Sequence, residues 1–271
     1  MPAAEPSLPP IGLGLWRTDN QQAHSAVLEA FKIGYRAVDT ASVYNNEKGV
    51  GQAIREAMDQ IGLTREEIFV TTKLWNDSHG YDAALKAFDQ SLARLGLDRV
   101  DMYMIQWPAP GQNLYPEAWR AIIRLRDDGK IRYIGVSNFL PEHIDRLYDE
   151  TGEKPSVNQM ELHPYFQQSD ICFQLEARNV KIEAWAPLGC GCCLQDPLFR
   201  KLALKYGKTP AQIVLRWHIE CGRTAVPKSV KPIRIRENFD VFDFHLDSED
   251  MRQVALLECC RRLGPNPQTF R

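Results

Sequence analysis

Short apolar runs alternate with longer amphipathic stretches along the whole chain. Most of these runs are nearly continuous in apolar residues, as is typical of strands that are covered on both faces of a parallel sheet. The pattern predicts eight parallel strands, at residues 11–16, 36–40, 68–73, 100–107, 132–137, 156–161, 181–185 and 224–228.

Between these runs the apolar residues recur with the period of a helix. Val27, Ala30 and Phe31 have this spacing before a stop at Gly34, and Thr209-Pro210 begins another helix with Thr as the N-cap. Strands that alternate with helices predict an α/β chain folded as one (β/α)8 TIM barrel over residues 1–271. An open, doubly wound sheet is the alternative, although eight parallel units are many for such a sheet.

Some predicted helices fall outside the barrel repeat. Residues 196–222 hold two helical stretches where one would suffice. A further turn at 234–238 and a helix at 248–258 follow the last predicted strand. We therefore expect extra helices near the C-terminus, which often build loops over the mouth of a barrel.

Charge and composition are those of an ordinary globular protein. The 271 residues include 33 basic and 35 acidic side chains, for a net charge of −2. This balance offers no electrostatic basis for binding nucleic acid. No apolar run approaches the roughly 20 residues of a membrane span, and the N-terminus lacks the features of a signal peptide. With seven cysteines, an odd number, we expect free thiols and a cytoplasmic location.

Polar residues recur where the predicted strands end, which is where barrel enzymes place their chemistry. Asp39 ends the second strand, Lys73 ends the third, and Tyr44 follows the second. We expect Asp39 and Lys73 to pair, because a lone buried charge is costly. A lysine beside Tyr44 would lower the pKa of its phenol and make it a usable proton donor. A structural salt bridge beside a surface tyrosine is the alternative.

Several longer motifs resemble the aldo-keto reductase family, and within it the bacterial 2,5-diketo-D-gluconate reductases. They are GYRAVDTA (34–41), YNNE (44–47), TTKLWN (71–76), IGVSNF (134–139), NQMELHP (158–164), PKSV (227–230) and RIREN (234–238). The resemblance extends from about Gly12 to residue 265. It implies a (β/α)8 barrel that reduces an aldehyde or ketone with NADPH.

The same resemblance implies a role for each matching residue. Tyr44 would be the general acid, supported by Asp39 and Lys73. Ser137, Asn138 and Gln159 would hold the nicotinamide carboxamide, and the Trp185 indole would stack on the ring. Pro187, Leu188 and Val230 would also belong to the cofactor site. Lys228, Ser229 and Arg234 would hold the 2′-phosphate, with Glu237 and Asn238 near the adenine. An Arg and a Lys together suit a phosphate, which favours NADP over NAD. The substrate would meet Trp16, Trp75, Asn76 and Trp107.

The chain departs from the family pattern at two places. The position at the end of the fourth strand, where the family has a histidine, is Gln106. A glutamine amide can donate a hydrogen bond to a carbonyl, but it cannot carry a proton. The proline-rich residues 5–10 run almost directly into the first strand, so we expect the N-terminal hairpin of the barrel floor to be missing or vestigial.

Other signals leave alternatives open. Cys190, Cys192 and Cys193 lack a partner pair at zinc spacing, so we expect no metal.

The resemblance implies a small carbonyl substrate, such as a keto-sugar acid or methylglyoxal, and we expect a monomer. Because Gln106 replaces the histidine, a weakly catalytic, redox-sensing NADPH-binding protein is one alternative. A lyase or isomerase that uses Lys73 as a Schiff base is another.

Overall fold

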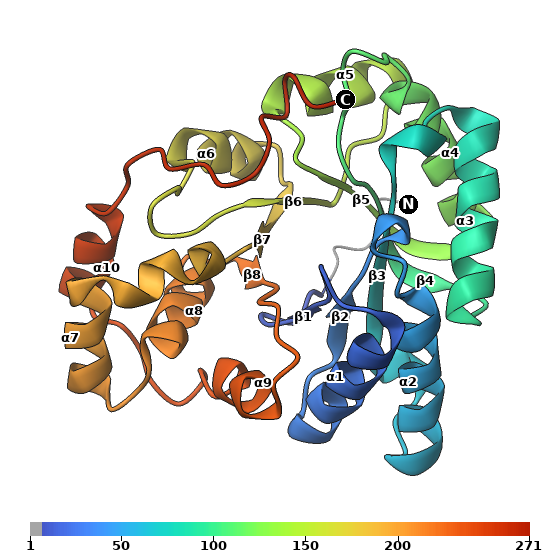
Figure 1. The fold of residues 1–271 in the computed structure, drawn as a ribbon. Helices are drawn as coiled ribbons and strands as arrows, with labels where there is room; N and C mark the ends of the chain where they lie inside the picture. Colours follow the sequence, from blue (N-terminus) through green and yellow to red (C-terminus); the bar gives the residue numbers. More distant parts are fainter. Residues whose placement is uncertain (1–6) are drawn as a thin grey trace.

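The computed structural model describes residues 7–271, and its strands form one parallel sheet in which each strand pairs with the next along the chain (Figure 1). The strands are β1 (Leu13–Gly14), β2 (Ala37–Asp39), β3 (Phe69–Leu74), β4 (Val100–Ile105), β5 (Ile131–Ser137), β6 (Val157–Glu161), β7 (Lys181–Trp185) and β8 (Thr224–Ala225). Each predicted run overlaps one of them, and β3 and β5 each extend one residue beyond the predicted run. β1 and β8 are shorter than predicted, with two residues each.

The first and last strands meet and close the ring. Ile11 forms a parallel bridge with Ala225, and Gly14 forms one with Lys228. The Gly14 N–H donates to Pro227 O over 3.1 Å. A Cβ at Gly14 would lie 2.7 Å from Val226 O, so a larger residue would push these strands apart. The expected barrel is confirmed over the alternative of an open sheet.

Helices surround the strands on the outside (Figure 1). They are α1 (Asn20–Ile33), α2 (Glu47–Gln60), α3 (Tyr81–Leu95), α4 (Tyr115–Asp127), α5 (Pro141–Thr151), α6 (Ser169–Ala177), α7 (Pro197–Tyr206), α8 (Pro210–Glu220), α9 (Pro232–Phe239) and α10 (Ser248–Ala255). As predicted, Gly34 ends α1 with φ +126°, and Thr209 caps α8 through a reciprocal contact with Gln212. The predicted extra helices are also present, as the pair α7 and α8 before β8, and as α9 and α10 after it.

Side chains alternate along each strand, so that every second residue faces the interior of the barrel and the others face the surrounding helices. Outward residues such as Val38, Val70 and Ile105 pack in the core beneath the helices. The floor of the barrel interior is filled by a separate apolar cluster of Ala37, Phe69, Met102, Met104, Tyr133 and Val157. Further along the same inward positions, the residues become polar. The candidate site therefore lies above an apolar floor, at the C-terminal ends of the strands.

Residues 7–10 form no strand, and they lie against β8 instead. Leu8 packs on the floor cluster, and Pro10 O accepts a hydrogen bond from the Ala225 N–H. Within residues 7–10 there is therefore no hairpin strand, and residues 5 and 6 of that prediction lie outside the described residues. Among residues 7–271, no helix has the length and apolar composition needed to cross a membrane.

Candidate active site

Asp39 at the end of β2 and Lys73 near the end of β3 form the predicted ion pair. Lys73 Nζ donates to both carboxylate oxygens of Asp39, over 2.6 and 2.7 Å, and to Thr40 O over 3.1 Å. Burial acts to lower the pKa of Lys73, but the charges of Asp39 and Tyr44 and the hydrogen bond to Asp39 outweigh it, and the net pKa is raised. Lys73 therefore stays protonated.

Tyr44 ends a short 3-10 helix, η1 (Ser42–Tyr44), that follows β2. Lys73 Nζ lies 5.5 Å from the centroid of its ring. Burial, together with the Asp39 charge, raises the pKa of the Tyr44 phenol, and these effects exceed the lowering by the Lys73 charge and by hydrogen bonds with Lys73 and Gln106. Lys73 thus acts in the predicted direction, but the expectation of a lowered net pKa is wrong, because burial disfavours the phenolate more strongly.

Gln106 directly follows β4 and is buried beside Tyr44. Its backbone is fixed on both sides, since its N–H donates to Leu74 O over 3.0 Å and its carbonyl accepts from Asn138 Nδ2 over 3.0 Å. The side chain interacts with the Tyr44 phenol through a hydrogen bond that lowers the pKa of the phenol. Its Oε1 is buried and has no partner among the described residues. The amide is therefore held at the phenol, with one acceptor left unused.

The residues predicted to hold the nicotinamide form a connected group. Asn138 has φ +63° and donates from Nδ2 to Ser137 Oγ over 3.0 Å. Its Oδ1 accepts a hydrogen bond from Trp185 Nε1 over 2.8 Å, which sets the plane of the indole. Gln159 Nε2 donates to Asp39 Oδ1 over 2.9 Å. The group is thus joined to the ion pair. Pro187 and Leu188 follow β7, and Pro187 O lies 3.1 Å from His218 Nε2.

The residues predicted for the phosphate and adenine lie around the end of β8 and in α9. Lys228 and Arg234 are exposed, while Ser229 and Asn238 are buried and Val230 is half-buried. Glu237 accepts a hydrogen bond from Thr209 Oγ1 over 2.6 Å. β1 links this group to the ion pair, because Gly14 is in register with Asp39 and bridges to Lys228. Two exposed cations next to the start of a helix suit a phosphate.

The predicted substrate residues divide into two sets. Trp75 and Trp107 both contact Phe270, with ring centroids 6.2 and 4.6 Å apart. Asn76 is buried, and neither of its amide atoms has a partner among the described residues. Trp16 instead stacks with Arg17 and is 48% exposed. An apolar wall with unpaired polar atoms is typical of a small-molecule pocket.

Sequence reasoning missed the C-terminal tail (residues 256–271), which crosses the mouth of the barrel. The Leu263 and Gly264 N–H groups donate to the Glu161 carboxylate over 2.6 and 2.9 Å. The tail runs from α10 past α6 toward α5 (Figure 1), and it brings Phe270 into contact with Trp75 and Trp107, two of the predicted substrate residues. Gly264 lies against the Trp185 indole, where a Cβ would come within 2.5 Å of the ring. The pattern of the tail contains no signal for these contacts.

A second missed residue is Glu183 of β7, which is 4% exposed. Its Oε2 accepts from Gln159 Nε2 over 2.6 Å. The sequence did contain a signal for Glu183. It precedes Trp185 by two residues in an apolar strand, so its side chain is expected on the same face of the strand as Trp185.

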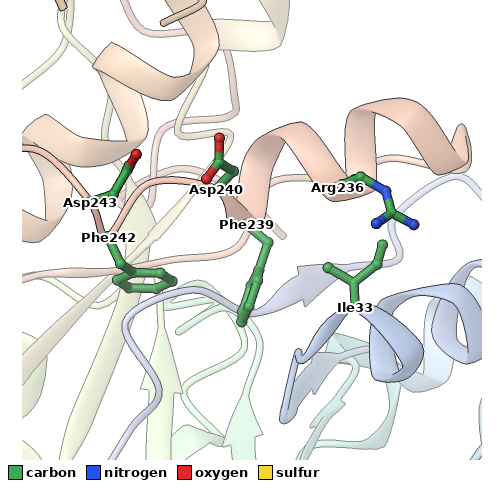
Figure 2. Close-up of a pocket in the computed structure, with 6 residues that line it drawn as sticks. All are labelled: Ile33, Arg236, Phe239, Asp240, Phe242 and Asp243. Atoms are coloured by element: carbon green, nitrogen blue, oxygen red, sulfur yellow. The ribbon is translucent and has the colours of Figure 1, made fainter.

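A cavity of about 420 Å³ lies between α1 and α9 (Figure 2), and none of its lining residues is a predicted site residue. Its lining residues are Ile33, Arg236, Phe239, Asp240, Phe242 and Asp243. In α9, Arg236 and Phe239 line this cavity, whereas Arg234, Glu237 and Asn238 do not. We therefore do not place the active site there.

The cysteines of the loop after β7 form no metal site. Cys192 Sγ and Cys193 Sγ lie 4.0 Å apart, and both residues are free thiols. Across residues 7–271, no group of three or more His, Cys, Asp or Glu side chains could hold a metal ion.

The chain is similar to known proteins over nearly its whole length. The chain is 49% identical to an aldo-keto reductase of Mycolicibacterium smegmatis, over 97% of this chain and 94% of that protein. It is 45% identical to the methylglyoxal reductase DkgA of Escherichia coli K12, with the same coverage of both chains. A crystal structure of a Gox0644 mutant in complex with NADPH superposes with a TM-score of 0.92 at 44% identity, over 97% of this chain and 95% of that one. The sequence model described as "Aldo/keto reductase family" matches residues 10–258. The chain belongs to the aldo/keto reductase family.

Proposed function

We propose that this protein reduces small aldehydes and ketones to alcohols with NADPH. The observation that carries the proposal is the contact of Tyr44 with both protonated Lys73 and Gln106 at the mouth of the barrel. This arrangement places a proton donor, a cation and a hydrogen-bond donor around one point. The methylglyoxal reductases among the relatives and the NADPH complex of a structural neighbour support this choice of substrate and cofactor.

The residues present fit NADPH, which when bound supplies the hydride to the carbonyl carbon. Ser137, Asn138 and Gln159 offer the donors and acceptors that a carboxamide needs, and Trp185 offers a flat face held by Asn138. Lys228, Ser229 and Arg234 would bind the 2′-phosphate by charge-assisted hydrogen bonds. Glu237 and Asn238, with Val230, would lie near the adenine, and Pro187 and Leu188 beside the nicotinamide.

Tyr44 would donate its phenolic proton to the carbonyl oxygen as that oxygen becomes negative. Lys73 would stabilise the resulting phenolate, because it stays protonated, and Asp39 would hold Lys73 in position. The raised pKa of the Tyr44 phenol keeps the proton in place until a carbonyl accepts it. Gln106 would polarise the carbonyl through its amide nitrogen, without relaying a proton.

The same geometry disfavours a Schiff-base mechanism at Lys73. A lysine nucleophile must be deprotonated, but Lys73 Nζ donates three hydrogen bonds and its pKa is raised. A borohydride-trapped adduct on Lys73 would overturn this argument. The replacement of histidine by Gln106 leaves a weakly catalytic NADPH-binding protein as the second candidate function.

One kinetic experiment separates these functions. NADPH oxidation is followed at the nicotinamide absorbance with methylglyoxal and a panel of keto-sugar acids and small aldehydes, and it is repeated with NADH and with Tyr44→Phe. We expect multiple turnovers with NADPH, and a loss of about 10²-fold or more in Tyr44→Phe with cofactor binding retained. Binding without turnover would favour the redox-sensing alternative. Unchanged rates in Tyr44→Phe would exclude Tyr44 as the general acid.

A further inference from the structure

Glu183 lies in the barrel interior beneath the predicted nicotinamide site. In β7 it precedes Trp185 by two residues, so both side chains face inward, with Glu183 one layer deeper. It is in register with Gln159 of β6 and with Thr224 of β8. A carboxyl group at this depth is costly unless its neighbours compensate for the lost water. The neighbours of Glu183 therefore indicate its role.

The first neighbour is the amide of Gln159. Gln159 Nε2 has two hydrogens and donates one to Glu183 Oε2 over 2.6 Å and the other to Asp39 Oδ1 over 2.9 Å. With the opposite amide orientation, the Gln159 oxygen would face two carboxylates and be repelled. The two acids thus set the orientation of the amide, and its Oε1 is the atom left to accept a hydrogen bond from a carboxamide NH₂.

The second neighbour is the ion pair. The charged groups that face Glu183 are Asp39 of β2 and Lys73 of β3, while β6 and β8 contribute the neutral Gln159 and Thr224. Lys73 Nζ already donates to both oxygens of Asp39. Burial and the Asp39 charge raise the pKa of Glu183 to about 7, against the opposing effects of Gln159 and Lys73. Glu183 therefore exchanges a proton near neutral pH, which changes the charge of the barrel interior by one.

We propose that Glu183 is a positioning residue that orients Gln159 toward the nicotinamide and whose negative charge favours the oxidised cofactor over the reduced one. This inference rests on the proposed function. The oxidised nicotinamide ring carries a positive charge and the reduced ring is neutral. An ionised Glu183 attracts only the oxidised ring, whereas a protonated Glu183 has no charge and favours neither form of the ring. By linkage, binding of NADP⁺ favours loss of the proton from Glu183.

The test measures the dissociation constants of NADP⁺ and NADPH by calorimetry between about pH 5.5 and 8.5, on either side of the titration of Glu183. Titration of the 2′-phosphate is common to both nucleotides and cancels in the ratio of the two constants. In the unsubstituted protein we expect NADP⁺ to gain about fivefold over NADPH as the pH rises through this range. In Glu183→Gln, which keeps an acceptor oxygen but carries no charge, the ratio is expected to be independent of pH.

Glu176→Gln is the matched control, because it removes one negative charge on the outer helix α6 and should leave the pH dependence intact. Thermal unfolding of each variant checks folding. A flat ratio in the unsubstituted protein overturns the inference whether or not Glu183→Gln folds, and so does a pH dependence that persists in Glu183→Gln. If neither nucleotide binds, the proposed function fails; if both bind with a constant ratio, only the inference fails.

Discussion

Lys73 Nζ lies 2.6 and 2.7 Å from the two carboxylate oxygens of Asp39, and both side chains are buried at the ends of neighbouring strands. This pair is connected to both halves of the candidate site. Lys73 lies over the Tyr44 ring and lowers the pKa of its phenol, and Asp39 accepts a hydrogen bond from Gln159. Substitutions in the pair should therefore affect stability and chemistry together, and a second substitution can separate the two.

Lys73→Met should destabilise the protein and reduce turnover. It leaves the Asp39 carboxylate buried without its cation, which costs about 3–5 kcal/mol in the free energy of unfolding. Urea denaturation at neutral pH measures this cost. The double variant Lys73→Met/Asp39→Asn should recover stability but not turnover. A single variant as stable as the unsubstituted protein would show that the pair contributes nothing to folding.

Gln106→His should raise turnover about tenfold or more, because an imidazole can both donate a hydrogen bond and exchange a proton. The affinity for NADPH should change little, since the side chain of Gln106 faces Tyr44. Steady-state rates and NADPH binding, measured across pH, test both expectations. If the histidine variant is slower, Gln106 is a specialised substrate contact, and its unpaired Oε1 is the atom to examine.

Arg234→Ala should weaken NADPH binding about tenfold or more and leave NADH binding nearly unchanged. The reason is the loss of one charge-assisted hydrogen bond to the 2′-phosphate, which NADH lacks. Arg236→Ala is the matched control, because Arg236 lies in the same helix but lines the cavity toward α1 (Figure 2). Equal losses for both nucleotides would remove Arg234 from the phosphate site.

Glu161→Gln should loosen the C-terminal tail. Burial acts to raise the pKa of Glu161, but hydrogen bonds from His163 and from the Leu263 and Gly264 N–H groups outweigh it, and the net pKa is lowered. Because the pKa of Glu161 is lowered in the folded state, its anchoring of the tail is fully present at pH values above the ordinary pKa of a carboxyl group. The anchoring is lost as the pH falls through the pKa of Glu161 in the folded protein.

Hydrogen exchange at the Leu263 and Gly264 amides measures this anchoring. At neutral pH we expect exchange about tenfold or more faster in Glu161→Gln, because hydrogen bonds to a charged acceptor are replaced by neutral ones. The KM for substrate should also rise, since Phe270 covers Trp75 and Trp107. Glu249→Gln in α10 is the control. Equal exchange rates in the two variants would contradict the role of Glu161.

The sequence by itself determined the strands, their order and most of the polar residues at their ends. Apolar spacing is a local property, so it predicted each of the eight strands to within a few residues, and the alternation with helices predicted the barrel. Asp39 and Lys73 could be paired in advance because neighbouring parallel strands bring their ends together. The motifs around Tyr44, Asn138 and Arg234 carried the resemblance, and the family match supports it.

Only the tertiary structure decided which distant residues meet and how their surroundings change their chemistry. Phe270 reaches Trp107 across more than half of the chain, and no local pattern encodes that contact. Glu183 becomes important because β7 faces β2 and β3 across the interior, where water is excluded. The net pKa of Tyr44 was misjudged for the same reason: the sequence identifies the neighbouring lysine, but the extent of burial, which outweighs that lysine, exists only after the barrel has closed.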